Sequence, residues 1–129
     1  MSITVRQRGD LSTEIIYKGK GFSIDSELRD SGLFTKISSE NQIISIRKME
    51  GIPDTEQAIK EHTEIVADIK KLILAENLGE YIKRTCELIE IKRFHEALLL
   101  TREVRFFHPG DPYLMCLDGY LTASIEKLR

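Results

Sequence analysis

The chain contains little of what marks secreted, membrane or disulfide-stabilised proteins. It has two cysteines, Cys86 and Cys116, among 129 residues, and no tryptophan. Two cysteines set far apart in helical patterns favour buried thiols in a reducing compartment over a disulfide framework. No apolar run of signal-peptide length opens the chain. None approaches the roughly 18 residues of a membrane span. We therefore expect a soluble, cytoplasmic protein without membrane contact.

An excess of charge of one sign is also missing. The formal net charge is −2 and the isoelectric point about 5.9, whereas nucleic-acid-binding domains commonly exceed a pI of roughly 9. This balance disfavours RNA or DNA as the main partner, although a local basic patch is compatible with it. With 41% hydrophobic residues, a domain of this length buries roughly two-thirds of its unfolded surface. Folding therefore requires no disulfide and no metal.

Catalytic and metal-binding motifs are absent as well. The spacings His-Glu-x-x-His, Cys-x-x-Cys and Gly-x-Ser-x-Gly do not occur. The glycines on either side of Lys20 lack the further glycines and the following helix of a phosphate-binding loop, and indicate a hairpin turn. His62 falls on an apolar stripe, which predicts a packed histidine with satisfied hydrogen bonds. We expect no catalytic residue, metal or cofactor; an enzyme with an unrecognised site is the remaining alternative.

The sequence divides into two halves in which the hydrophobic residues recur with different periods. Residues 1–52 hold strand candidates at 3–8, 13–17, 33–37 and 42–48. The first two are expected to pair as a hairpin, and residues 38–41 connect the last two tightly. Asp25 predicts a capped helical turn over residues 26–30. The N-terminal half is therefore expected to be a small β-rich unit of three or four strands.

Residues 53–129 follow a helical period. Asp54 and Gln57 form a capping-box pattern, and the apolar stripe that follows predicts a helix over residues 55–75. Three shorter helices are predicted by the later patterns and breaks, over residues 80–91, 93–107 and 112–127. The expected fold is α+β, with a β-rich unit over residues 1–52 and a helical region over residues 53–129.

The segment from Lys92 to Pro112 resembles the second half of a tetratricopeptide repeat (TPR). The family's aromatic, alanine, small apolar and proline positions are held by Phe94, Ala97, Val104 and Pro109. A small side chain at Ala97 lets two helices approach closely, and Pro109 ends the helix. The resemblance implies a TPR-like helical array.

Three positions depart from the family's pattern. Arg84 and Thr85 stand where leucine and a small residue are usual, and Thr101 replaces an aromatic. The segment 112–129 resembles the opening helix of a repeat that is not completed, with Gly119 at its small-residue position. Known short proteins of this kind include chaperones and adaptors of bacterial secretion systems. The segment 97–104 is also similar to the C-terminal part of the FlbT family, which regulates flagellin expression in bacteria.

In the tetratricopeptide arrangement the first helix of each repeat lines a concave face. The resemblance therefore implies an apolar groove for a helix or an extended segment of another protein. Its lining residues would be Ile82, Cys86, Ile89, Tyr113, Cys116 and Tyr120. The alternative is that these residues are simply core.

The densest basic group includes Arg102 and Arg105, which share one helix face. It predicts either a solvated mixed-charge surface or a contact for an acidic partner or RNA phosphate. We expect a protein–protein interaction module that acts as an adaptor, chaperone or regulator, of the kind found in bacterial secretion or flagellar systems. An RNA-binding post-transcriptional regulator of the flagellin type is the alternative.

Overall fold

The structure is a computed structural model that describes residues 3–128. The chain divides into two compact units between Lys71 and Leu72. The first unit contains a β-sheet and most of helix α1 (Thr55–Ile73), and the second contains the end of α1 and three further helices. The expected boundary lay after residue 52. The structure divides the chain later, because α1 buries its apolar side against the sheet.

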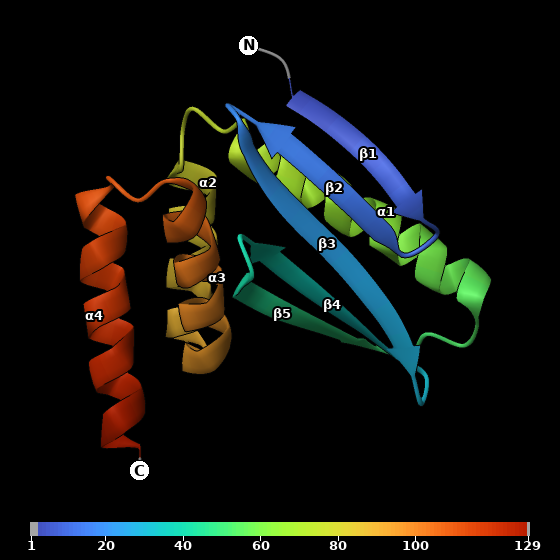
Figure 1. The fold of residues 1–129 in the computed structure, drawn as a ribbon. Coiled ribbons are helices and arrows are strands. Elements are labelled where there is room, and N and C mark those ends of the chain that lie inside the picture. The colour runs from blue at the N-terminus through green and yellow to red at the C-terminus, as the bar shows by residue number, and fades with distance from the viewer. Residues whose placement is uncertain (1–2, 129) are drawn as a thin grey trace. The chain divides into compact units, whose positions relative to one another are not determined.

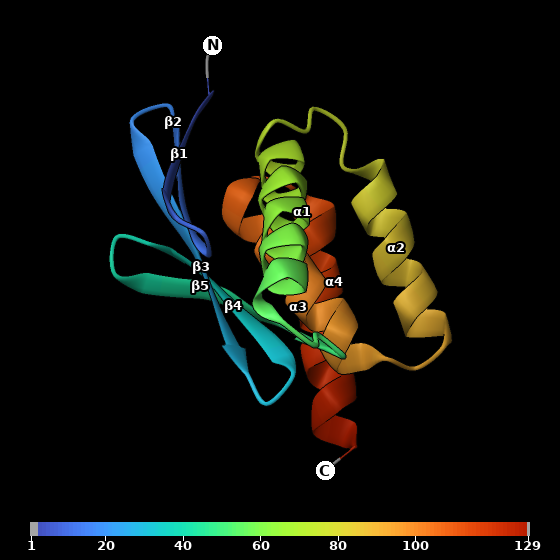
Figure 2. The same ribbon diagram turned by 90° about the vertical axis from the view of Figure 1, so that its right-hand side faces the viewer.

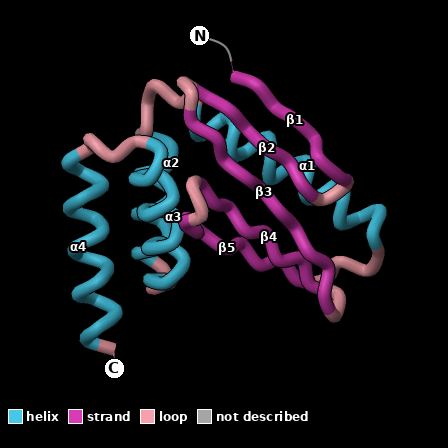
Figure 3. Tube along the Cα trace, viewed as in Figure 1, coloured by secondary structure: helices cyan, strands magenta, loops and turns pink. Residues whose placement is uncertain are grey.

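The sheet of the first unit is an antiparallel meander in sequential order (Figures 1 and 3). Its strands are β1 (Ile3–Gly9), β2 (Ser12–Tyr17), β3 (Lys20–Arg29), β4 (Gly32–Ser39) and β5 (Gln42–Glu50). The hairpins predicted for the first pair and for the last pair are confirmed. The α+β class is confirmed too, although the sheet has five strands where three or four were expected.

Tight turns explain why consecutive strands pair. The pairs that close the last three hairpins leave two-residue turns between them. All six turn residues have a positive φ, as type I′ turns require, and the twist of these turns matches that of the strands they join. These residues are Lys18 and Gly19, Asp30 and Ser31, and Glu40 and Asn41. The predicted hairpin turn is present at Lys18 and Gly19, whereas Gly21 lies in β3 opposite Ile16.

The helical turn predicted over residues 26–30 is wrong, because these residues lie at the end of β3 and in the following turn. Along β3, Phe22 and Ile24 point to the buried side of the sheet, and Ser26 follows them in the same alternation. A polar residue at an inward position interrupts the apolar alternation by which a strand is recognised. The reason for that serine lies in a contact with α1.

Helix α1 lies along one face of the sheet (Figures 1 and 2). The predicted cap at its start is present, because the Asp54 carboxylate accepts a hydrogen bond of 2.9 Å from the Gln57 backbone N–H. The apolar stripe of α1 is buried at Ala58, Ile65 and Ile69. The sheet residues that are fully buried in this unit are Ile15, Ile24, Leu33, Thr35 and Ile37.

The second unit contains α2 (Gly79–Glu90), α3 (Phe94–Phe107) and α4 (Pro112–Lys127), with bounds close to those predicted. The three helices run in alternating directions (Figure 2), and α3 packs against both α2 and α4. Their shared core contains Leu72, Tyr81, Val104 and Leu114. Each break between the helices was recognised correctly from the sequence.

Two of the three departures from the tetratricopeptide pattern, Thr85 and Thr101, are core residues, whereas Arg84 is exposed. Thr85 is 1% exposed and Thr101 is fully buried. Their hydroxyls donate to carbonyls one turn earlier, at Tyr81 (2.9 Å) and Ala97 (2.8 Å). Each hydroxyl is thus satisfied within its own helix, which allows the side chain to be buried without a partner from another helix. Ala97 is fully buried, as expected for a close approach between helices.

Candidate protein-binding surface on helix α4

Helix α4 buries one side and exposes large apolar residues on the other. Leu114 and Leu121 are fully buried in the second unit. On the solvent side, Tyr113 is 56% exposed, Met115 53% and Tyr120 55%. The small residues of the same side are exposed as well. We call this surface the α4 face and define it by Tyr113, Met115, Cys116, Gly119, Tyr120 and Ala123.

The α4 face carries no charge. Between Pro112 and Ser124 the sequence contains a single charged residue, Asp118, and its side chain is only 14% exposed. A surface helix ordinarily places charged and polar side chains opposite its buried side. Single exposed apolar residues are common, but a contiguous apolar surface marks an interaction site. The α4 face is therefore the candidate surface of the second unit.

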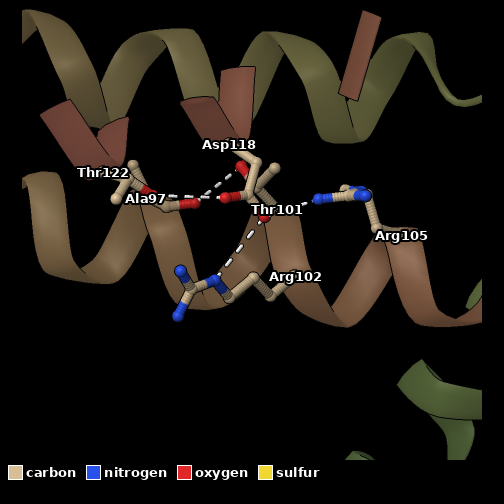
Figure 4. Close-up of polar contacts among 6 residues, drawn as sticks. All are labelled: Ala97, Thr101, Arg102, Arg105, Asp118 and Thr122. Carbon is tan, nitrogen blue, oxygen red and sulfur yellow. Dashed lines mark hydrogen bonds and ion pairs between the residues drawn. The ribbon is translucent and has the colours of Figure 1, made fainter. Parts of the chain in front are cut away.

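Asp118 joins α4 to α3 (Figure 4). Arg105 Nη1 donates a hydrogen bond of 2.8 Å to its Oδ2, and Arg102 Nε lies 3.5 Å from the same oxygen. The Thr122 hydroxyl donates to Oδ1 at 3.3 Å. The two arginines that the sequence marks as a contact for anions are therefore both paired with one carboxylate of the same unit. Asp118 was not recognised from the sequence, because its partners lie on another helix.

The six groove residues predicted from the sequence fall into two groups. Tyr113, Cys116 and Tyr120 are exposed on α4. The predicted residues of α2 are each half-buried: Ile82, Cys86 and Ile89. Ile82 packs against the core cluster to which Leu114 of α4 also belongs. The exposed surface is thus centred on α4. Its further members Met115 and Ala123 were missed, although the uncharged stretch that contains them can be read from the sequence.

A second group of side chains that could take part in chemistry surrounds His62 in the first unit. Its Nδ1 lies 2.6 Å from Ser26 Oγ, its Nε2 lies 2.9 Å from Thr13 Oγ1, and Ser26 Oγ lies 2.8 Å from Thr35 Oγ1. Burial lowers the pKa of His62, and the charge of Asp25 acts in the opposite direction without cancelling this effect. A serine beside a histidine is the beginning of a nucleophilic site. However, His62 is only 3% exposed, on the side of α1 that faces the sheet. The prediction of a packed, satisfied histidine is confirmed.

Residues 3–128 contain no group of three or more His, Cys, Asp or Glu side chains placed to hold a metal ion. No helix within the same range has both the length and the hydropathy needed to cross a bilayer. No family model, curated protein or solved structure matches the chain. A function must therefore be argued from the surfaces themselves.

Proposed function

We propose that the chain is a protein-binding module of the adaptor, chaperone or regulator type, and that it docks its partner on the α4 face. The observation that carries this proposal is the uncharged surface on which Tyr113, Met115 and Tyr120 are each more than half exposed. Tyrosine and methionine are enriched at protein interfaces, and charged residues are depleted from interface centres. An apolar helix or extended segment of another protein is the class of partner that suits such a surface.

A protein partner fits this surface better than RNA does. Phosphate binding depends on cationic side chains, and the α4 face has none. Arg102 and Arg105, on the neighbouring helix, both form ion pairs with Asp118. The remaining alternative, an enzyme, would have to use the Ser26–His62 contact, which lies in the core of the first unit.

The test is affinity capture from the native cell with three versions of the protein. Tyr120→Ala removes an anchor of the α4 face, and Leu99→Ala is the matched control. Leu99 is 53% exposed but lies on α3, outside the α4 face. We expect Tyr120→Ala to weaken capture by about 1 kcal/mol or more, while Leu99→Ala and the thermal melts of all three stay unchanged. Equal capture by all three versions would place the binding surface elsewhere.

A titration with labelled RNA at two salt concentrations tests the alternative. The proposal expects no binding in the micromolar range. Micromolar affinity that falls steeply with salt, and that disappears when Arg102 and Arg105 are both replaced by alanine, would establish RNA as the partner instead.

A further inference from the structure

Hydrophobic burial alone does not decide which side of α4 faces the core. Leu114 and Leu121 are fully buried and lie seven residues apart, on one side of the helix. Tyr113 and Tyr120 have the same separation, and each directly precedes one of these leucines. They therefore lie roughly 100° around the helix axis from the leucines. A tyrosine ring and a leucine side chain have comparable apolar surface, so turning α4 by this one step would exchange one apolar side for another.

Asp118 borders the side of α4 that is buried. It follows Leu114 by four residues and precedes Leu121 by three, so the three side chains lie close together on the helix surface. The Asp118 side chain is only 14% exposed, and both of its oxygens are used (Figure 4). One accepts a hydrogen bond of 2.8 Å from Arg105, and the other accepts one from the Thr122 hydroxyl. A charge-assisted hydrogen bond of this length depends strongly on geometry.

Another rotation of α4 would leave the arginines of α3 without an acceptor on α4. Asp118 is the only charged residue between Pro112 and Ser124, so no side chain of this stretch can take its place. Arg105 is 34% exposed, and Arg102 lies 3.5 Å from the same carboxylate oxygen. Breaking an ion pair in a partly desolvated site is unfavourable because it leaves a charge without its partner. The ion pairs thus distinguish between rotations that differ little in the apolar surface they bury.

We propose that Asp118 is the positioning residue of the α4 face: its ion pairs with Arg102 and Arg105 set the rotation of α4 and so keep Tyr113 and Tyr120 in solvent. Buried ionic contacts in other proteins are known to select one arrangement among several. The inference deepens the proposed function, on which it rests for the use that a partner makes of the tyrosines. The rotation itself can be measured without a partner.

Acetylation of tyrosine hydroxyls by N-acetylimidazole, mapped by mass spectrometry, measures the rotation in the full chain. The reagent modifies tyrosines that are open to solvent, so the rates at Tyr113 and Tyr120 report the fraction of molecules that expose these two reporter tyrosines. Tyr81 is 8% exposed in the core of the same unit and shows whether that unit stays folded. Tyr17, half-buried in β2, normalises the reaction between samples.

Two sets of substitutions remove the ion pairs from opposite sides. Asp118→Ala removes the carboxylate from α4, and Arg102→Ala with Arg105→Ala removes its partners from α3. In both we expect acetylation of the reporter tyrosines to slow by about twofold or more, twofold being the value for two equally populated rotations. Asp118→Glu keeps a carboxylate and should restore most of the wild-type rate. Glu126→Ala removes an exposed carboxylate from the same helix and should leave the rate unchanged.

A merely structural role of Asp118 predicts a different result. Loss of stability would expose Tyr81 and raise its rate, and it would not slow the reaction of the reporter tyrosines. If Tyr81 becomes reactive in one of the two sets of substitutions, the other set decides. Reactive Tyr81 in both sets, or unchanged reporter rates in a folded variant, overturns the inference and assigns the rotation of α4 to apolar packing.

Affinity capture with the same variants separates the inference from the function on which it rests. Slower acetylation together with weaker capture supports both. Slower acetylation with unchanged capture supports the inference and overturns docking on the α4 face. Unchanged acetylation overturns the inference, and Tyr120-dependent capture by the wild type then leaves the proposed function standing.

Discussion

Replacing His62 by phenylalanine tests the polar contacts that join α1 to the sheet. The change keeps a planar ring in the core and removes both hydrogen-bonding nitrogens. The hydrogen bond of 2.9 Å between Thr13 Oγ1 and His62 Nε2 is then lost. Ser26 Oγ loses its bond to the ring and keeps its contact of 2.8 Å with Thr35 Oγ1. A buried hydroxyl left without a partner costs about 1–3 kcal/mol. We expect the free energy of unfolding to fall by about 2–3 kcal/mol.

Urea unfolding followed by circular dichroism measures this loss. His95→Phe is the matched control, because His95 is exposed on α3 and the same substitution there disturbs no core. A His62→Phe protein whose stability lies within about 0.5 kcal/mol of the wild type, the range usual for surface changes, would show that the contacts add nothing to folding. The choice of serine and threonine at these inward positions would then need another reason.

The same histidine makes the stability depend on pH. Burial lowers the pKa of His62 in the folded chain, with the Asp25 charge opposing this only in part. The unfolded chain has the ordinary pKa of about 6.5 and so binds the proton more readily. The contribution of neutral His62 is therefore complete above about pH 6.5 and is lost as the pH falls towards its folded pKa. His62→Phe should lack this part of the decline; identical pH profiles for the two proteins would contradict the assignment.

Three further substitutions test the packing of each unit. Ala97→Leu should lower the thermal stability by about 1–3 kcal/mol, because the alanine is fully buried and a larger group overpacks the contact; an unchanged melt would remove the support for a close helix approach. Ile65→Ala and Ile69→Ala should each cost about 2–5 kcal/mol in urea unfolding, and neutrality of both would mean that the stripe of α1 is not core. Gly119→Ala should raise the stability of the dilute protein by up to about 1 kcal/mol, and a clear loss would contradict the open space around this residue.

The helices could be predicted from the sequence because their signals are local. Asp54 caps α1 and Asp111 caps α4 by accepting backbone N–H bonds of the first turn. Lys92, with a φ of 61°, marks the turn between α2 and α3. Each of these signals acts within a few residues of the helix end that it determines, so no knowledge of the tertiary structure was needed.

Strand β3 was not predicted from the sequence, because one of its inward positions holds a serine that contacts a residue far away in the sequence. Ser26 occupies an inward position because His62, on α1, needs a polar partner there. The same contact holds α1 against the sheet, so the compact unit that contains the sheet extends to Lys71. A stripe containing a histidine is compatible with packing on helices or on a sheet, and here the hydroxyls of Thr13 and Ser26 are the partners of that histidine.

The α4 face could be predicted in part, because its tyrosines repeat at helical spacing, but its exposure could not. A helix that is apolar around most of its circumference is either enclosed by its own protein or covered by another. The sequence of α4 fits both descriptions. Its one charged residue between Pro112 and Ser124 is Asp118, and this carboxylate is paired with Arg102 and Arg105. The structure distinguishes them, because Leu114 and Leu121 fill the core while Tyr120 remains 55% exposed. The second unit thus buries only one side of a helix whose composition suits burial on both, and a partner helix is the simplest cover for the other.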